Sequence, residues 1–413
     1  MHMSLRNTLL ASSSLSSFAF VSGSPARQRA AEAVSYDLPL TWSSFGFLSS
    51  HMSLGTPPQQ ITTFVDWTWI SQYVFTTTCH GVADKPFDCF AKEQSIFNQS
   101  QSSTFLDESY LYPSRTWNPN HFFFYEDLTV DYASDIGVVG PSSARLTIQT
   151  ADFQFDISDA PYPLTGVYGL SPVFKADNRS MQSPFYQAWS AGAWPEPFVA
   201  FHYCYNGSVD TTKSTCGGYD GLQTLGGFNM SLIDGEMSWY DIVFFTDVNE
   251  IDFEYSPPIY NYWTLQLTEL SLGDKVQALN KSRGAGAIFD HASYGRGAPL
   301  SVNAYEELIS ISGATPIALD SPPNNGNQSF YEVDCDRVEA LPPIKYRFGG
   351  SERPWEIVPS NYVETINDTC VLNVRTLGDG DMIAGNFGET FAKDKYIVFD
   401  FEKLKVGLAD VRW

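Results

Sequence analysis

The sequence predicts an all-β protein built of two lobes. The chain has 413 residues, which is long for a single core and fits two domains of ordinary size. Alternating apolar and polar residues, as in Trp263–Leu267 and Phe153–Ile157, indicate strands, and 30 Gly and 24 Pro supply turns between them. A third observation is a pair of aspartates, Asp66 and Asp290, each of which ends a short apolar run. Two matched runs of this kind favour two related lobes.

Helical periodicity is rare in this sequence. The clearest helices are expected around Phe185–Ala193 and Asn303–Ser312, each near a Ser or Pro that favours a helix start. The remaining regular structure is therefore expected to be strands.

The two aspartates end the runs Thr63–Asp66 and Ala287–Asp290. If each lobe brings one carboxylate to a shared cleft, the two like charges cannot both ionise, because they lie a few ångströms apart. Such a pair shares a proton, supplies an acid and a base together, and titrates as a unit.

Further motifs follow one another in a fixed order along the chain. They are Leu54–Gln59 (LGTPPQ), Asp131–Ser134 (DYAS) with Ile136–Gly140 (IGVVG), Gly166–Leu170 (GVYGL), Met382–Gly385 (MIAG), Tyr396–Asp400 (YIVFD) and Lys405–Ala409 (KVGLA). Together with the two aspartates, they resemble the pepsin family of aspartic proteases from about Tyr36 to Trp413.

The resemblance implies a bilobal, pepsin-like double β-barrel with a few short helices and a cleft between the lobes. It implies an N-terminal lobe over residues 36–228 and a C-terminal lobe over residues 229–413, preceded by a short segment over residues 24–35. Asp66 and Asp290 would be the catalytic residues, and Tyr132 the tyrosine of the flap hairpin. Gly166–Leu170 would cross under the first aspartate, and Met382–Gly385 under the second.

Both catalytic triplets depart from the family pattern. The family has Asp-Thr-Gly or Asp-Ser-Gly, whereas this chain has Asp66-Trp67-Thr68 and Asp290-His291-Ala292. Trp67 cannot lock the two carboxylates in one plane as the family's hydroxyl residue does, and a threonine is hard to fit where the family has glycine. Since a displacement of about 1 Å can cost on the order of a hundredfold in rate, we expect impaired peptide hydrolysis.

The two half-sites are expected to be unequal. Trp69 stands where the family has a serine that hydrogen-bonds the first carboxylate, whereas Ser293 is retained in the second half-site. Loss of that donor would raise the pKa of Asp66, so Asp66 is the expected proton carrier and Asp290 the better anion. A charged His291 would stabilise the Asp290 carboxylate, but His291 is also compatible with an exposed loop residue without a role.

The resemblance also implies that four aromatic residues, Trp67, Trp69, Tyr73 and Tyr132, line or overhang the cleft. Such a surface suits flat or apolar ligands. The alternative for Trp67 and Trp69 is an ordinary place in the core. Two functions therefore remain open: a pepsin-fold protein whose cleft binds an apolar ligand or performs acid–base chemistry on it, and an active acid endopeptidase that cleaves polypeptides with Asp66 and Asp290.

Several features indicate export. Residues 1–23 read as a secretory signal peptide, with a disordered N-terminus as the alternative, and the 12 residues before the first strand leave no room for the family's inhibitory pro-segment. The cysteines favour three local disulfides, Cys79–Cys89, Cys204–Cys216 and Cys335–Cys370, although six cysteines allow fifteen pairings; the resemblance supports the first and the third. Seven Asn-X-Ser/Thr sequons suit a glycoprotein: Asn98, Asn178, Asn206, Asn229, Asn280, Asn327 and Asn367.

Charge and composition argue against nucleic-acid-binding, metal-binding and membrane-spanning proteins. The formal net charge of −23, from 47 acidic and 24 basic residues, disfavours nucleic acid as a partner. The six His and six Cys form no cluster with the spacing of a metal site, so neither a metal nor another cofactor is expected. No apolar run is long enough to span a membrane. We therefore expect a secreted, monomeric protein.

Overall fold

The computed structural model describes residues 34–42, 48–79, 96–117, 128–153, 165–174, 177–204, 215–244, 262–280, 285–290, 297–318, 329–376, 380–383 and 385–413. The chain divides into two compact units, Met1–Glu32 and Ala33–Trp413, and the described residues all belong to the second. The expected signal peptide and the residues Cys89, Asn206, His291, Ser293 and Asn327 lie outside the described part. The lobe boundary at residues 228 and 229 stays a prediction.

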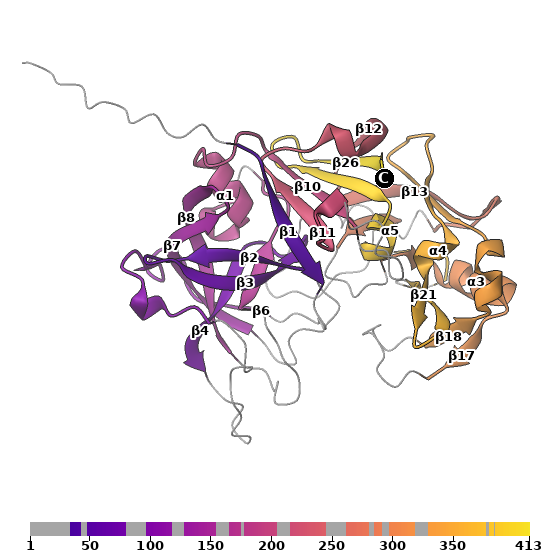
Figure 1. Cartoon of the computed structure of the whole chain (residues 1–413), viewed down its shortest axis with the longest axis horizontal. Helices are drawn as coiled ribbons and strands as arrows, with labels where there is room; N and C mark the ends of the chain where they lie inside the picture. The colour runs from indigo at the N-terminus through magenta and orange to yellow at the C-terminus, as the bar shows by residue number, and fades with distance from the viewer. Residues whose placement is uncertain are drawn as a thin grey trace, which may run out of the picture. The chain divides into compact units, whose positions relative to one another are not determined.

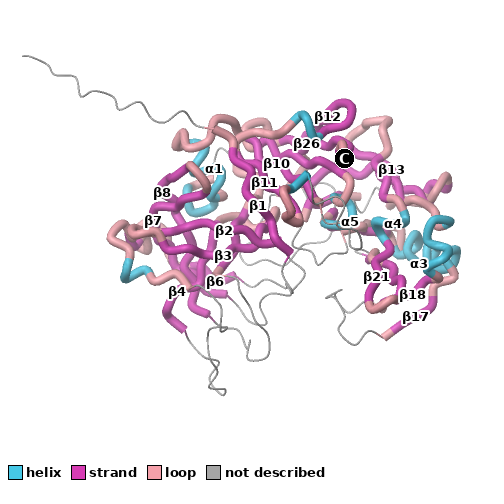
Figure 2. Tube along the Cα trace, viewed as in Figure 1, coloured by secondary structure: helices cyan, strands magenta, loops and turns pink. Residues whose placement is uncertain are grey.

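Strands dominate the described part of the chain (Figure 2). The largest sheet has 14 strands, in the order β12-β26-β25-β10-β11-β1-β2-β3-β9-β4-β8-β7-β5 with β6 on β7. They are β1 (Tyr36–Trp42), β2 (Leu48–Leu54), β3 (Gln59–Asp66), β4 (Gln72–Cys79), β5 (Leu106–Asp107), β6 (Arg115–Trp117), β7 (Leu128–Val139), β8 (Ser142–Phe153), β9 (Gly166–Gly169), β10 (Phe198–Tyr203), β11 (Gly221–Leu225), β12 (Ile233–Asp241), β25 (Lys395–Asp400) and β26 (Lys405–Val411).

Part of this sheet closes into a barrel. Strand β7 pairs with β8 on one side and with β2 on the other, so β2, β3, β9, β4, β8 and β7 form a ring. Strand β9 fits between β3 and β4 because it carries glycines: a Cβ at Gly166 would lie 2.0 Å from the carbonyl O of Tyr73, and one at Gly169 would lie 2.1 Å from that of Ser71. These glycines hold the crossing strand beside the end of β3.

The rest of the large sheet joins the two ends of the described chain. Strand β1 pairs with β11, β11 with β10, and β10 with β25, next to β26 (Figure 1). Phe198 lies opposite Asp400 in this register. The predicted closing strands Tyr396–Asp400 and Lys405–Ala409 are thus confirmed as β25 and β26.

The other described strands form three smaller sheets, in the orders β20-β19-β13-β15-β24 with β14 on β13, β16-β23, and β17-β18-β22-β21. They are β13 (Thr264–Leu272), β14 (Lys275–Val276), β15 (Gly286–Phe289), β16 (Pro299–Leu300), β17 (Thr315–Ile317), β18 (Phe330–Val333), β19 (Ile344–Phe348), β20 (Trp355–Ile357), β21 (Val363–Ile366), β22 (Thr369–Leu372), β23 (Arg375–Thr376) and β24 (Asn386–Phe387).

The described helices are short. They are α1 (Pro184–Ser190), α3 (Val302–Ser312), α4 (Pro359–Tyr362) and α5 (Glu389–Ala392), with 3-10 turns η1 (Gln99–Gln101), η2 (Arg179–Met181), η4 (Met230–Leu232) and η5 (Cys335–Ala340). The two predicted helices are confirmed as α1 and α3, whose first turns are capped by the hydroxyls of Ser183 and Ser301. None of the helices in the described ranges has the length and apolar character that a membrane crossing needs.

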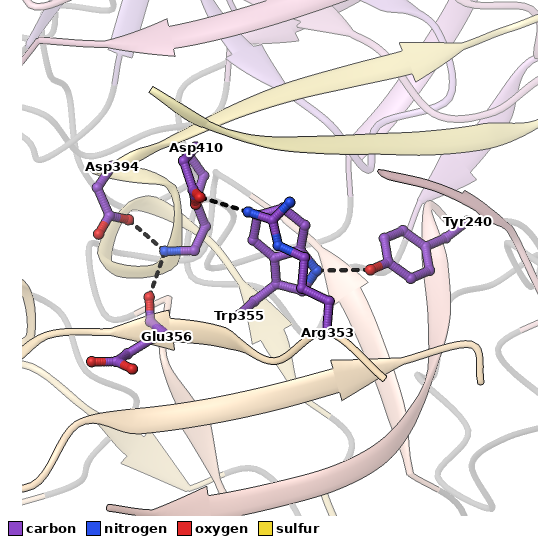
Figure 3. Close-up of polar contacts among 7 residues, drawn as sticks. Tyr240, Arg353, Trp355, Glu356, Asp394 and Asp410 are labelled. Atoms are coloured by element: carbon purple, nitrogen blue, oxygen red, sulfur yellow. Dashed lines mark hydrogen bonds and ion pairs between the residues drawn. The ribbon is translucent and has the colours of Figure 1, made fainter. Parts of the chain in front are cut away.

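A polar cluster fastens β20 and its neighbours to the large sheet (Figure 3). Lys395 Nζ donates to the carbonyl O of Glu356 at 2.7 Å and also contacts the Asp394 carboxylate. The indole Nε1–H of Trp355 donates to the hydroxyl of Tyr240 at 2.8 Å. Arg353 lies 4.0 Å from the centre of the Trp355 ring and pairs with Asp410. These contacts link residues that are far apart in the sequence.

Two of the three expected disulfides lie within the described residues. Cys204 is bonded to Cys216, with their Cα atoms 6.1 Å apart, and Cys335 is bonded to Cys370, with their Cα atoms 5.4 Å apart. The first closes the loop between β10 and β11, and the second ties η5 to β22. Cys89, the partner expected for Cys79, lies outside the described residues, so this third disulfide stays a prediction.

The expected flap hairpin differs in the structure. Tyr132 lies in the middle of β7, opposite Gln149 of β8, and the ladder continues without a break to Val139 opposite Ser142. The turn therefore falls at Gly140, eight residues beyond the tyrosine. Because the backbone bonds of β7 are used in this ladder, Tyr132 is held in the barrel wall with 2% of its surface exposed.

Candidate active site

Asp66 is positioned by the end of β3 and by the strand that crosses beside it. It lies opposite Gly169 in the parallel pairing of β3 with β9, and the N–H of Leu170 donates to its carbonyl O at 2.8 Å. Its side chain is 7% exposed. The predicted crossing strand Gly166–Leu170 is thus confirmed in its place beside the first aspartate.

Asp290 is positioned by a matching pair of strands. It follows β15, which runs parallel to β24 with Ile288 opposite Asn386. The N–H of Asp290 donates to the carbonyl O of Phe387 at 3.1 Å, and the side chain is 7% exposed. A Cβ at Gly385 would lie 2.1 Å from Pro299, so this glycine permits the close approach of the second crossing segment. The two half-sites are therefore built on the same plan.

The carboxylate of Asp66 accepts hydrogen bonds from its own loop. Oδ1 accepts from the N–H of Thr68 at 2.8 Å, from the Thr68 hydroxyl at 2.7 Å and from the N–H of Trp69 at 3.1 Å. Position 69 holds no serine, as the sequence shows, but the structure supplies a hydroxyl donor from Thr68. The β-branched side chain places its hydroxyl on the carboxylate two residues before it, and so replaces the serine that Trp69 displaces.

Burial raises the pKa of Asp66, and the three hydrogen bonds from Thr68 and Trp69 oppose this rise. The direction agrees with the expectation from the sequence, but the cause is burial and not the loss of a donor. All three hydrogen bonds that the described residues donate to this carboxyl end on Oδ1. A proton on the carboxyl therefore belongs on Oδ2, because Oδ1 is occupied as an acceptor.

Asp290 has a donor that the sequence did not indicate. The side-chain Nδ2 of Asn386, itself 5% exposed, donates to Asp290 Oδ2 at 2.8 Å. Asn386 directly follows the motif Met382–Gly385. That position is the available signal, since a side chain at the start of the crossing strand must lie near the aspartate that ends its neighbour.

Trp67 is a core residue and not a cleft surface. Its side chain is 0% exposed and packs against Phe201 at 5.0 Å and Phe399 at 5.2 Å between ring centres. The expectation that it lines the cleft was wrong, and the alternative of a buried aromatic describes it. The residue directly after Asp66 thus points into the core, where it cannot bridge to the second half-site through a hydroxyl.

Trp69, Tyr73 and Tyr132 are also packed within the protein. Trp69 is 6% exposed and lies edge-on to Tyr73, which is 1% exposed, with ring centres 5.3 Å apart. Tyr132 lies edge-on to Tyr112 at 5.7 Å, and burial raises the pKa of its hydroxyl, opposed by the charge of Arg115. A ligand-binding role for these three residues stays a prediction, as it does for His291 and Ser293 outside the described part.

One group of potential metal ligands occurs among the described residues. His202, Cys204 and Cys216 are buried, with their ligand atoms within 4.8 Å of one another. Both sulfurs belong to the Cys204–Cys216 disulfide, so they do not offer thiolates. Burial lowers the pKa of His202 to about 4, and its Nε2 lies 3.0 Å from the hydroxyl of Thr215.

Three of the predicted glycosylation sequons share one local geometry. Asn98, Asn178 and Asn229 each begin a 3-10 turn, and each Oδ1 accepts from both the N–H and the hydroxyl of the serine two residues on. Asn280 and Asn367 also lie among the described residues, and Asn367 has a φ of 48°. Glycosylation of the seven sequons stays a prediction.

Known proteins with similar sequences agree with the fold described above. The sequence matches the family model of the eukaryotic aspartyl proteases over residues 49–411. It is 55% identical over 405 residues to an aspartic protease-like protein, pytH, of Aspergillus terreus, covering 94% of this chain and 95% of the relative. It is 52% identical over 388 residues to a protein of the same description, pynH, of Aspergillus niger, covering 92% and 93%.

Other relatives are named as secreted proteins. The chain is 46% identical over 388 residues to a probable secreted aspartic protease of Arthroderma benhamiae, with 91% of this chain and 93% of the relative covered. The predicted secretory destination is confirmed by this and by more distant relatives named secreted aspartic proteases. The chain belongs to the eukaryotic aspartyl protease family, with the pepsin-like, bilobal all-β fold that the sequence predicted.

Proposed function

We propose that Asp66 and Asp290 perform acid–base chemistry on a small apolar ligand, and that efficient peptide hydrolysis has been lost. The observation that carries this proposal is the hydrogen bonding of Asp66. Three donors converge on Oδ1 of a carboxyl whose pKa is raised by burial. A protonated Asp66 then carries its proton on Oδ2, where it can be given to a ligand.

The second half-site supplies the complementary group. Asn386 donates to Asp290 Oδ2, and a hydrogen bond from an amide stabilises the ionised form of a carboxyl. Asp290 therefore serves as the base while Asp66 serves as the acid. Two carboxyl groups in unequal surroundings are the usual way in which one site supplies both functions.

The loss of peptide hydrolysis follows from the altered triplets. The family's hydroxyl residue after the first aspartate is replaced by Trp67, whose ring lies in the core. A water molecule that attacks an amide needs two carboxyls held in one plane, and small displacements cost large factors in rate. Proton transfer to or from a bound ligand tolerates a less strict geometry, provided that each group reaches its proton.

The relatives support the same proposal. Those at 55% and 52% identity are named aspartic protease-like and not aspartic proteases. An apolar ligand suits a site near which Trp69 and Tyr73 pack edge to face.

The test uses apolar cyclic ketones in deuterium oxide, with the mature protein as catalyst. Uptake of solvent deuterium next to the carbonyl, measured by mass spectrometry, reports proton transfer. We expect uptake above background with the wild type, reduced about 10²–10⁴-fold in Asp66→Asn and Asp290→Asn. Asp400→Asn is the matched control, because Asp400 is also a buried aspartate that accepts two backbone N–H groups. Uptake that is the same in all four proteins would contradict the proposal.

The second candidate function is an acid endopeptidase. It is favoured by the retention of both aspartates with dedicated donors and by the secreted aspartic proteases among the relatives. It predicts cleavage of a denatured protein at acid pH that both Asp→Asn variants abolish. Simple binding of an apolar ligand without turnover would leave both variants able to bind.

A further inference from the structure

Trp263 is a buried tryptophan whose side chain reaches the backbone beside the first aspartate. It lies directly before β13, with 0% of its surface exposed. Its indole Nε1–H donates to the carbonyl O of Leu170 at 2.7 Å. The N–H of the same Leu170 donates to the carbonyl O of Asp66 at 2.8 Å. A single residue therefore separates the indole from the first aspartate.

The main chain of Trp263 reaches the second aspartate in a similar way. Its carbonyl O accepts from the N–H of Phe289 at 2.9 Å, and Phe289 directly precedes Asp290. The strands that end at the two aspartates belong to different sheets, β3 to the 14-stranded sheet and β15 to the six-stranded one. Side chain and main chain of one residue thus connect the two half-sites across the boundary between sheets.

Aromatic packing holds the indole of Trp263 in place. Its ring stacks on Phe399, with ring centres 4.7 Å apart and planes at 14°, and lies edge-on to Phe401 at 5.0 Å. Phe399 also receives the edge of Trp67, the residue after Asp66. The two half-sites are therefore joined twice, by hydrogen bonds through Leu170 and by the aromatic series Trp67–Phe399–Trp263.

We propose that Trp263 is a positioning residue that fixes the spacing of Asp66 and Asp290, so that the two carboxyl groups titrate as one pair. Tryptophan suits this role because it combines a large ring for the stack with an N–H that donates at its far end. Phenylalanine retains most of the ring but cannot donate. The inference goes beyond the proposed function, because the spacing matters whether the pair acts on an apolar ligand or on a peptide.

The test compares Trp263→Phe with Trp355→Phe. Trp355 is a matched control, since it is 1% exposed and donates its Nε1–H to the Tyr240 hydroxyl at 2.8 Å, within the polar cluster at β20 (Figure 3). Carbon-13 nuclear magnetic resonance of aspartate-labelled protein gives the two apparent pKa values of the pair, assigned with Asp66→Asn and Asp290→Asn. We expect the separation between these values to shrink by about one unit or more in Trp263→Phe and to stay unchanged in Trp355→Phe.

Both variants should lower Tm, so a change in Tm alone does not support the proposal. A wild-type titration in Trp263→Phe, or an equal change in both variants, would overturn it. If Trp263→Phe does not fold, Phe399→Leu takes its place, because it loosens the stack and leaves the indole N–H intact. A smaller shift in the same direction is then expected, and an unchanged titration would count against the proposal. No turnover is needed, so the result is independent of the proposed function.

Discussion

The two half-sites share one strand plan, and the donors that the described residues supply to the two aspartates come from different parts of the chain. Asp66 accepts from Thr68, two residues away in its own loop, whereas Asp290 accepts from Asn386, 96 residues away on a neighbouring strand. A local donor moves with its loop, so the hydrogen bonds from Thr68 to Asp66 depend little on distant packing. The second depends on the pairing of β15 with β24. The comparison teaches that one strand plan can supply an aspartate with a hydrogen-bond donor either from its own loop or from a distant strand.

The largest expected effect concerns the residue that follows the first aspartate. Trp67→Ala should lower the free energy of unfolding by about 3–5 kcal/mol, because a fully buried ring would leave a cavity against Phe201 and Phe399. Denaturant unfolding measures this loss. Trp239→Ala is the control, since Trp239 is 37% exposed and should cost about 1 kcal/mol. Equal losses of stability in the two variants would contradict the burial of Trp67 and favour a place on the cleft surface.

The next effect concerns a buried acidic residue close to the second half-site. Glu389, in α5 just beyond Asn386, is 6% exposed, and burial raises its pKa to about 7, opposed by Lys393 and reinforced by Glu364 and Asp220. The folded state binds the proton of the Glu389 carboxyl more tightly than the unfolded state does. The stability that this protonation contributes is therefore fully present below about pH 4.5 and is lost as the pH rises through about 7. It amounts to about 3 kcal/mol.

Glu389→Gln should remove this pH dependence. Unfolding free energies measured at several pH values between 4 and 8 should fall with rising pH in the wild type and fall less in the variant. Glu402→Gln, at an exposed position, serves as the control. A variant with the same slope as the wild type would show that the Glu389 carboxyl does not titrate in this range.

A smaller effect tests the long-range donor of the second half-site. Asn386→Ala should cost about 1.5–3 kcal/mol, since it removes a hydrogen bond to a carboxylate, and should move the titration of the aspartate pair to higher pH. Asn373→Ala is the control, because Asn373 is also buried and donates to the Thr390 hydroxyl. The control should lose stability without a change in titration. If the aspartate pair titrates in the same way in both variants, the hydrogen bond from Asn386 does not affect the ionisation of Asp290.

The smallest effect tests the local donor of the first half-site. Thr68→Val keeps the shape of the side chain and removes its hydroxyl, so the pKa of Asp66 should rise further, because a hydrogen bond that stabilises the ionised form is lost. Thr68→Ser retains the hydroxyl and should titrate as the wild type does. If valine and serine give the same curve, the Thr68 hydroxyl contributes nothing to the ionisation of Asp66.

The sequence predicted what depends on local pattern and on motif order. Apolar runs predicted the strands that end at Asp66 and Asp290, and periodicity with capping residues predicted the helices α1 and α3. The crossing strand after Gly166 and the closing strands were implied by the resemblance of their motifs to the pepsin family. Each of these features is set within a few residues of chain. The all-β fold followed from them.

The features that the sequence did not predict depend on the direction in which a side chain points and on contacts between residues that are far apart in the sequence. Whether Trp67 points into the core or the cleft depends on the path of the backbone after β3, and Thr68 reaches Asp66 only because of that path. Asn386 meets Asp290 through the register of β15 with β24, which brings together residues 96 positions apart. The unbroken ladder around Tyr132 likewise reflects pairing and not residue type.

The most direct test of the central claim is digestion of denatured casein at pH 3–5 by the mature wild-type protein, with Asp66→Asn as the blank. The claim is that Asp66 and Asp290 form an unequal carboxyl pair that still transfers protons but no longer has the geometry needed to hydrolyse an amide. It predicts that wild type and blank release the same small amount of peptide, while the wild type alone catalyses proton exchange on an apolar ketone. Peptide release by the wild type that disappears in the blank would contradict it.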